Sequence, residues 1–172
     1  RLATEKNVSE IYVDGSKLVI LGTRWENNGP IYYKEGPAVD QKSIDMMPPY
    51  QPPRSFSFAD VYDISNPLKP VFLKGHEMQG SYQSSRKNGD IVYLVTNSYP
   101  GGGIILPMMK DTAVSNEEFS VKLGDVMIMP NHPCPGYLII SAINVSNGDK
   151  TEVEAITAYG ATMYMNDSAM YL

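Results

Sequence analysis

The chain has 172 residues, of which 42% are hydrophobic and 19% charged, so it can bury a core and is too apolar to be disordered. A net charge of −5 argues against a nucleic-acid partner, because phosphate binding needs clustered lysine and arginine. No apolar run is long enough to span a membrane, and one cysteine excludes an internal disulfide. The chain opens without an initiator methionine, so we expect a mature or excised segment, whose missing leader has no bearing on secretion.

The first predicted element is a hairpin with strands over 10–13 and 17–21. Asp14-Gly15 between them predicts a type I′ turn, since both central residues of that turn need a positive φ. The same unit returns over 84–95, around Asn88-Gly89, and a weaker copy closes the chain over 162–172.

A second kind of unit lies between these hairpins. Residues 60–67 lead into a strand over 70–74 and a turn at Gly80, and residues 140–147 lead into a strand over 151–156 and a turn at Gly160. Gly15 and Gly89 stand 74 residues apart, and Gly80 and Gly160 stand 80 apart. Two independent landmarks that recur at nearly the same spacing indicate a repeat.

Each period holds four strands, as a β-propeller blade does. We therefore predict an all-β fold: a fragment of a β-propeller with about two four-stranded antiparallel blades and long inter-strand insertions. This partial domain covers 1–172, with repeat one over about 8–80, repeat two over about 81–160 and the start of a third over 161–172. Two periods cannot close a ring, so exposed blade edges are expected to favour self-association.

Two insertions rich in proline and glycine lengthen the repeats, over 26–55 and 98–136. Proline removes donors from a strand ladder, so both are predicted to be loops or irregular excursions rather than central strands. If each joins the second and third strands of its blade, both emerge on one face of the propeller. Loops of this length are usually functional or mobile.

Three segments carry a resemblance to a known family. They are Tyr-Val-Asp-Gly-Ser-Lys-Leu-Val-Ile over 12–20, Val-Tyr-Asp-Ile-Ser-Asn-Pro over 61–67 and Ser-Ser-Arg-Lys-Asn-Gly-Asp-Ile-Val-Tyr-Leu-Val-Thr-Asn over 84–97. Together they resemble bacterial secreted proteins with a C-terminal β-propeller distantly related to WD-40 repeats. The resemblance implies a secreted or cell-surface protein and supplies neither an established activity nor catalytic residues.

Aromatic side chains of the insertions are the first candidates for ligand binding. Trp25, Tyr32, Tyr33 and Tyr50 gather in the first insertion, and Tyr99 opens the second. Exposed rings supply contact area at small entropic cost, and they also stack on sugar rings. Alternatively, these rings fold down over the blades and cover apolar surface.

Arg86 is the best single candidate for contact with an acidic ligand. It stands in a strand before a tight turn, where it could equally pair with Asp90 or with a carboxylate of the next blade.

Metal binding has two candidate sets, each with a structural alternative. Oxygen-rich groups that could hold calcium, or simply form local turns, recur in both repeats: they are Asp60, Asp63 and Asn66, then Asn144, Asn147 and Asp149. His132 and Cys134 could supply two metal ligands or a nucleophile with its base, but they also fit a proline-rich loop. Apart from calcium, no cofactor is expected.

No paired acid and base stand out, so we predict a non-catalytic binding or scaffold module, and the resemblance implies that it works outside the cell. Its insertions would contact an unknown protein or carbohydrate. The alternative is a hydrolase or lyase acting on polysaccharide or peptide, with a site spread over several blades. The carboxylates in or near the insertions that would serve it are Asp40, Asp45, Asp111, Glu117 and Glu118.

Overall fold

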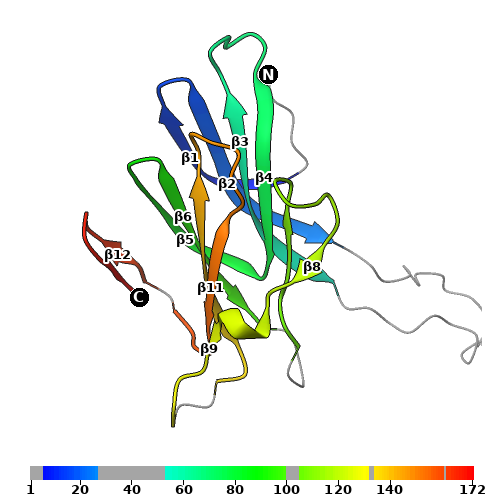
Figure 1. Cartoon of the computed structure of the whole chain (residues 1–172), viewed down its shortest axis with the longest axis vertical. Helices are drawn as coiled ribbons and strands as arrows, with labels where there is room; N and C mark the ends of the chain where they lie inside the picture. The colour runs from blue at the N-terminus through cyan, green and yellow to red at the C-terminus, as the bar shows by residue number, and fades with distance from the viewer. Residues whose placement is uncertain (1–5, 27–52, 100–104, 132–133, 161) are drawn as a thin grey trace, which may run out of the picture.

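The computed structural model describes residues 6–26, 53–99, 105–131, 134–160 and 162–172. Among these residues the only helical element is one short 3-10 turn, η1 (Leu123–Asp125), and all the strands belong to three sheets (Figure 1). The fold is therefore all-β, as predicted.

The first sheet has the strand order β1-β2-β3-β4-β7-β8, with every neighbouring pair antiparallel. Its first four members follow one another along the chain and form an up-and-down meander. The bounds are β1 (Asn7–Asp14), β2 (Lys17–Glu26), β3 (Arg54–Asp63), β4 (Val71–Gln79), β7 (Met108–Asp111) and β8 (Phe119–Ser120).

The second sheet has the order β5-β6-β10-β11-β9, in which only the short β9 runs parallel to its neighbour. Its four antiparallel strands repeat the meander of the first sheet, so the prediction of two four-stranded antiparallel blades is confirmed. The bounds are β5 (Ser81–Asn88), β6 (Ile91–Ser98), β9 (Val126–Met127), β10 (Tyr137–Asn144) and β11 (Glu152–Ile156). The described sheets do not close into a ring (Figure 1).

Both predicted tight turns form, but one residue later than expected. Asp14 pairs with Lys17 and Asn88 with Ile91, so the turn residues are 15–16 and 89–90. Only the first residue of each turn has a positive φ, 54° at Gly15 and 53° at Gly89. A glycine at the first central position is the mark of a type II′ turn, and the type I′ prediction was wrong.

The insertion over 98–136 contains short strands at sheet edges, which the prediction of loops and irregular excursions did not include. β7 and β8 extend the first sheet, and β9 extends the second. This stretch therefore contacts both blades. Most of the other insertion, residues 27–52, lies outside the described residues.

The two sheets pack face to face along a seam of buried apolar side chains. One cluster joins Val19, Leu21 and Val61 of the first sheet to Leu94 and Ile143 of the second. A second cluster, nearer the edge, joins Met78 and Met109 to Ile139 and Ala155. Burial on this scale is the main source of stability for the pair.

A third hairpin, β12 (Tyr164–Met165) with β13 (Met170–Tyr171), continues the stack. Met163 and Met170 pack with Val95 and Leu138 on the side of the second sheet that faces away from the first. Figure 1 shows this hairpin standing beside the second sheet. Three successive β units thus lie face to face, as neighbouring blades of a propeller do.

Candidate functional site

A cleft of about 470 Å³ opens where the two sheets meet at one end of the seam. We call it the inter-sheet cleft. Its lining combines the start of β3, the junction of β4 and β5, the end of β6 and one residue beyond β11. These residues are Pro53, Arg54, Ser55, Gln79, Gly80, Ser81, Gln83, Asn97, Ser98, Tyr99 and Tyr159.

The back of the inter-sheet cleft is fixed by close backbone contacts. Gly80 has a φ of 132°, and a Cβ atom there would lie 2.4 Å from the Asn97 carbonyl oxygen, so only glycine fits. The Asn97 side chain donates a 2.7 Å hydrogen bond to the Gly160 carbonyl and accepts one at 3.4 Å from the Gly160 N–H. The glycine turn of each repeat therefore meets the end of β6, and the junction is rigid.

Two tyrosines form one wall of the inter-sheet cleft. The ring centroids of Tyr99 and Tyr159 are 5.5 Å apart and the rings are tilted by 43°. Both rings stay more than half exposed, at 59% and 55%. Burial, together with Tyr99 and Cys134, raises the pKa of Tyr159 above its ordinary value of 10.0. Two rigid apolar faces are thus open to a ligand.

The polar groups of the inter-sheet cleft are mostly neutral, and none of its described lining residues is acidic. The side chain of Gln79 accepts a 3.0 Å hydrogen bond from the Met108 N–H, which leaves its amide nitrogen as a donor. The one cation, Arg54, is engaged by Glu26 at 2.5 Å and by Glu118 at 3.0 Å. The described lining of the cleft can therefore exchange hydrogen bonds, and its one cation is compensated.

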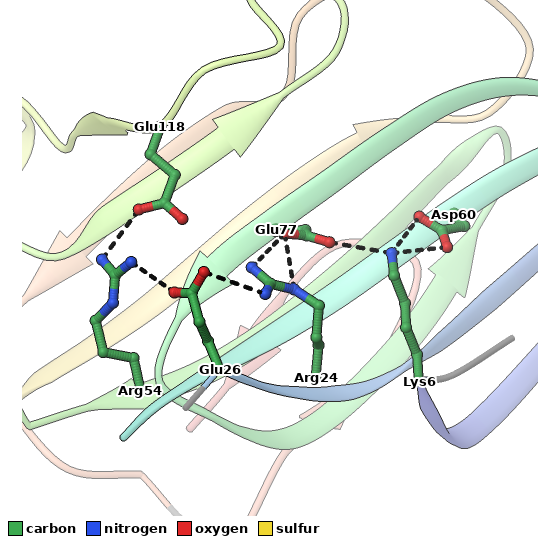
Figure 2. A network of polar contacts seen from close by, with 7 residues as sticks. All are labelled: Lys6, Arg24, Glu26, Arg54, Asp60, Glu77 and Glu118. Atoms are coloured by element: carbon green, nitrogen blue, oxygen red, sulfur yellow. Dashed lines mark hydrogen bonds and ion pairs between the residues drawn. The ribbon is translucent and has the colours of Figure 1, made fainter. Parts of the chain in front are cut away.

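Arg54 also belongs to a charged network that covers the outward face of the first sheet (Figure 2). Lys6 contacts Asp60 and Glu77, each at 3.0 Å, and Arg24 contacts Glu77 at 2.9 Å. The network consists of Lys6, Arg24, Glu26, Arg54, Asp60, Glu77 and Glu118.

Beneath the charged network lie two phenylalanines with no exposed surface, Phe56 and Phe58. The Lys6 ammonium sits 4.5 Å from the centroid of Phe58, and the guanidinium carbons of Arg24 and Arg54 sit 4.6 and 5.1 Å from that of Phe56. The network therefore seals an apolar layer with cation–π contacts.

A second polar group is buried inside the seam. His76 and Ser141 have no exposed surface and are joined by a 2.9 Å contact between Nε2 and Oγ. Burial lowers the pKa of His76 to about 4, so its imidazole is neutral at neutral pH. The carboxylate of Asp111, its partner across the β4–β7 pair, accepts main-chain hydrogen bonds from Thr151 at 2.6 Å and Ala113 at 2.9 Å.

This composition of serine, histidine and aspartate is that of a hydrolytic triad, but its geometry is not. Nδ1 of His76 has no hydrogen-bond partner among the described residues, whereas a triad needs the aspartate there. All three side chains are also shut off from solvent. The group therefore lacks the geometry of a triad and forms part of the buried packing of the seam. Asp111, one of the carboxylates considered for an enzyme, is committed to this structural role.

Of the predicted ligand contacts, Tyr99 lines the inter-sheet cleft. Trp25 lies next to the cleft, 61% exposed and opposite the lining residue Ser55 in the β2–β3 pair. Tyr32, Tyr33 and Tyr50 lie outside the described residues.

Arg86 does not line the inter-sheet cleft and lies three residues along β5 from its lining residue Gln83. Its guanidinium donates to the Ser85 carbonyl at 2.6 Å and to the Ser84 hydroxyl at 3.3 Å. Asp90 instead accepts a hydrogen bond from Ser146, so the suggested pairing of Arg86 with Asp90 was wrong.

The oxygen-rich groups considered for calcium make local turns. The side chains of Asp63, Asn66, Asn144 and Asn147 each accept a hydrogen bond from the main-chain nitrogen two residues further on. Asp60 is held by Lys6. Within the described residues, no three His, Cys, Asp or Glu side chains gather as metal ligands would. His132 lies outside those residues, and Cys134 is a free, half-buried thiol.

Tyr159 and Gln79 were missed in the sequence, although a signal for them existed. Each directly precedes the glycine turn of its repeat, Gly160 or Gly80. Residues at equivalent positions of adjacent blades emerge at the same end of the stack, so the repeat alignment alone places both there.

Comparison with known proteins agrees with this architecture. No curated protein and no solved structure gives a significant match to the chain. In the part of the chain that the structure describes, no helix is long and apolar enough to cross a membrane. A family model described as Beta propeller domain matches residues 1–172. The sheet stacking and this full-length match lead to one conclusion: the chain belongs to the beta propeller domain family.

Proposed function

We propose that this chain is a non-catalytic binding module that works outside the cell and holds its ligand in the inter-sheet cleft. One observation carries the proposal: residues beside both insertions line the same cleft. Pro53 to Ser55 stand where the first insertion ends, and Asn97 to Tyr99 stand where the second begins. Binding residues are concentrated on loops that a rigid scaffold positions, and the stacked sheets supply such a scaffold.

The absence of acidic groups from the described lining of the inter-sheet cleft favours binding over hydrolysis. Glycosidic hydrolysis needs two carboxyl groups at a defined separation across the bond. Glu118 is paired with Arg54, and Asp111 is buried in the seam. Asp40 and Asp45 lie outside the described residues. No observation favours the hydrolase or lyase alternative.

Retention of a ligand by the immobilised chain tests this proposal. Polysaccharide and protein fractions from the exterior of the source cells are passed over wild-type protein, over Tyr99→Ala and over Arg86→Ala as control. We expect retention of unaltered material that Tyr99→Ala weakens and Arg86→Ala leaves unchanged. Release of a cleaved product would overturn the non-catalytic assignment.

The extracellular location rests on the resemblance to secreted propeller proteins. Protease treatment of intact source cells tests it, because a surface protein is removed while cytoplasmic markers stay intact. Survival of the protein in intact but not in lysed cells would contradict the proposal.

Self-association through blade edges stays a prediction. β1 is an edge strand with Ile11 and Val13 exposed at 57% and 64%. Light scattering after size-exclusion chromatography, over a dilution series, distinguishes a discrete oligomer from a monomer.

A further inference from the structure

We propose that the ligand of the inter-sheet cleft is a neutral saccharide, bound by stacking on Tyr99 and Tyr159 and by hydrogen bonds to the neighbouring amides. This inference rests on the proposed binding function and assigns its ligand class. Four features of the cleft support it: its charge, its polar lining groups, its aromatic wall and its position relative to the sheet edges.

The charge balance selects an uncharged ligand. The described lining has no carboxylate, and its one arginine has both terminal nitrogens engaged by Glu26 and Glu118. An acidic or basic ligand would lose its hydration without gaining an uncommitted counter-charge, which is unfavourable. A neutral ligand that carries many hydroxyl groups avoids this cost.

The polar lining groups suit hydroxyl groups. Within the described residues, the amide of Gln83 makes no hydrogen bond, and the amide of Gln79 uses only its oxygen, at Met108. An amide presents a donor and an acceptor side by side, so it can hold two adjacent hydroxyls of a sugar ring. The hydroxyls of Ser55 and Ser81 add further groups that both donate and accept.

The aromatic wall suits the apolar face of a sugar ring. Tyr99 and Tyr159 are 59% and 55% exposed, and their rings are tilted by 43° rather than stacked on one another. Aromatic faces carry partial negative charge, which attracts the polarised C–H groups of a pyranose. The volume of about 470 Å³ lies within the range of about 300–1,000 Å³ that small-molecule sites occupy.

The position of the inter-sheet cleft disfavours an extended peptide. Peptides commonly bind by adding a strand to an open sheet edge. The cleft instead lies across the ends of β3, β4 and β6, where the Gly80 N–H already donates to the Ser55 carbonyl at 2.8 Å. The ends of β3, β4 and β6 offer a peptide no ladder to continue, and only β5, which supplies Ser81 and Gln83, is an edge strand there.

Calorimetric titration of the full chain with uncharged oligosaccharides tests the inference. The probes are β-1,4-linked glucose, xylose, mannose and N-acetylglucosamine oligomers, with a polygalacturonate oligomer as the charged comparison. The variants are Tyr99→Ala, Tyr159→Ala and Gln83→Ala. Tyr171→Ala is the matched control, because the pair of Tyr164 with Tyr171 is equally exposed and tilted but lies on the third hairpin.

We expect at least one neutral oligomer to bind and the charged one not to. Tyr99→Ala and Tyr159→Ala should each weaken that binding about tenfold or more, and Gln83→Ala about threefold to tenfold, as truncation of a contact residue does. Tyr171→Ala should stay within about twofold of wild type.

Two failures would be distinguishable. Binding of only the charged oligomer or a protein, with the same sensitivity to Tyr99→Ala, would overturn the saccharide assignment and leave the binding function standing. If every ligand found is insensitive to Tyr99→Ala and Tyr159→Ala while both variants stay folded, both proposals fail. Circular dichroism and thermal unfolding of each variant establish that it is folded.

Discussion

The outward face of the first sheet and the inter-sheet cleft are both polar, but their polar groups are used differently. On the outward face, three cations and four carboxylates pair with one another (Figure 2), and two buried phenylalanines lie beneath them. In the cleft, the groups are amides, hydroxyls and two half-exposed tyrosines. Charges that are paired with one another stabilise a surface but leave few charged groups to contact a ligand. Neutral groups with spare hydrogen-bonding capacity remain available for such contacts. The first region therefore stabilises the fold, and the second is the one that we propose for binding.

The sharpest way to test this contrast is to remove the layer beneath the charged network. Phe58→Ala should lower the free energy of unfolding by roughly 3–5 kcal/mol, because the ring is fully buried and the Lys6 ammonium rests on it. Phe72→Ala is the control on the same sheet, since Phe72 is 48% exposed and should cost much less. Denaturant unfolding measures both. Equal losses would show that the network does not seal a core.

Acidification should weaken the seam through His76. Burial lowers the pKa of His76 in the folded protein to about 4, below the ordinary value of 6.5. As the pH falls, His76 is therefore protonated in the unfolded chain before it is protonated in the folded one. The contribution of neutral His76 to the free energy of unfolding is therefore fully present above pH 6.5. It is lost as the pH drops toward 4, by up to roughly 3 kcal/mol.

Denaturant titrations between pH 7.5 and pH 5 measure this loss, in a range where ordinary carboxylates stay ionised. His76→Gln is the control, since its amide can replace the contact to Ser141 without titrating. An equal pH slope in the variant would assign the effect to other groups.

The charged network should contribute less than the phenylalanines that it covers. Arg24→Ala removes contacts to Glu77 and Glu26 and a guanidinium above Phe56, and we expect a loss of about 1–2 kcal/mol. The loss should shrink in high salt, because these side chains are partly exposed. Lys17→Ala, which removes a single ion pair at a strand end, should cost less. A larger loss from Lys17→Ala would contradict this ranking.

The smallest change in stability is expected in the inter-sheet cleft itself. Tyr99→Ala and Tyr159→Ala should each alter the free energy of unfolding by no more than about 0.5 kcal/mol, because more than half of each ring is exposed. Thermal unfolding measures this. Losses above about 2 kcal/mol would show that the rings support the fold, which was the alternative reading of the aromatic residues.

The fold was predictable because its signals are local and repeat. Alternating apolar residues and glycine turns predicted the strands. The glycine turn at position 80 recurs at position 160, and this spacing predicted the blades. The exact turn was not predictable from the dipeptide, since Asp14-Gly15 fits either register and strand pairing decides between them. The short strands β7 and β9 were missed because they depend on an edge strand supplied from elsewhere in the chain.

The candidate site was predictable only in part. Tyr99 was predicted as a ligand contact because it opens a long insertion; the structure places it in the inter-sheet cleft, and its role in binding stays a prediction. The polar lining comes from four separate stretches of chain that only the stacking of two sheets brings together, so no local pattern marks it. The charged network likewise joins Lys6 to Glu77 across 71 residues, which sequence spacing does not reveal.

Mapping of a bound ligand by NMR tests the central claim most directly. In a ¹H–¹⁵N spectrum of the full chain titrated with the tightest-binding neutral oligosaccharide, we predict that the perturbed amides cluster at Gln83, Asn97, Tyr99 and Tyr159. Amides beneath the charged network, at Phe58 and Glu77, should stay unperturbed. Perturbations centred on that outward face, with the cleft silent, would contradict the division of the molecule into a stabilising face and a binding cleft.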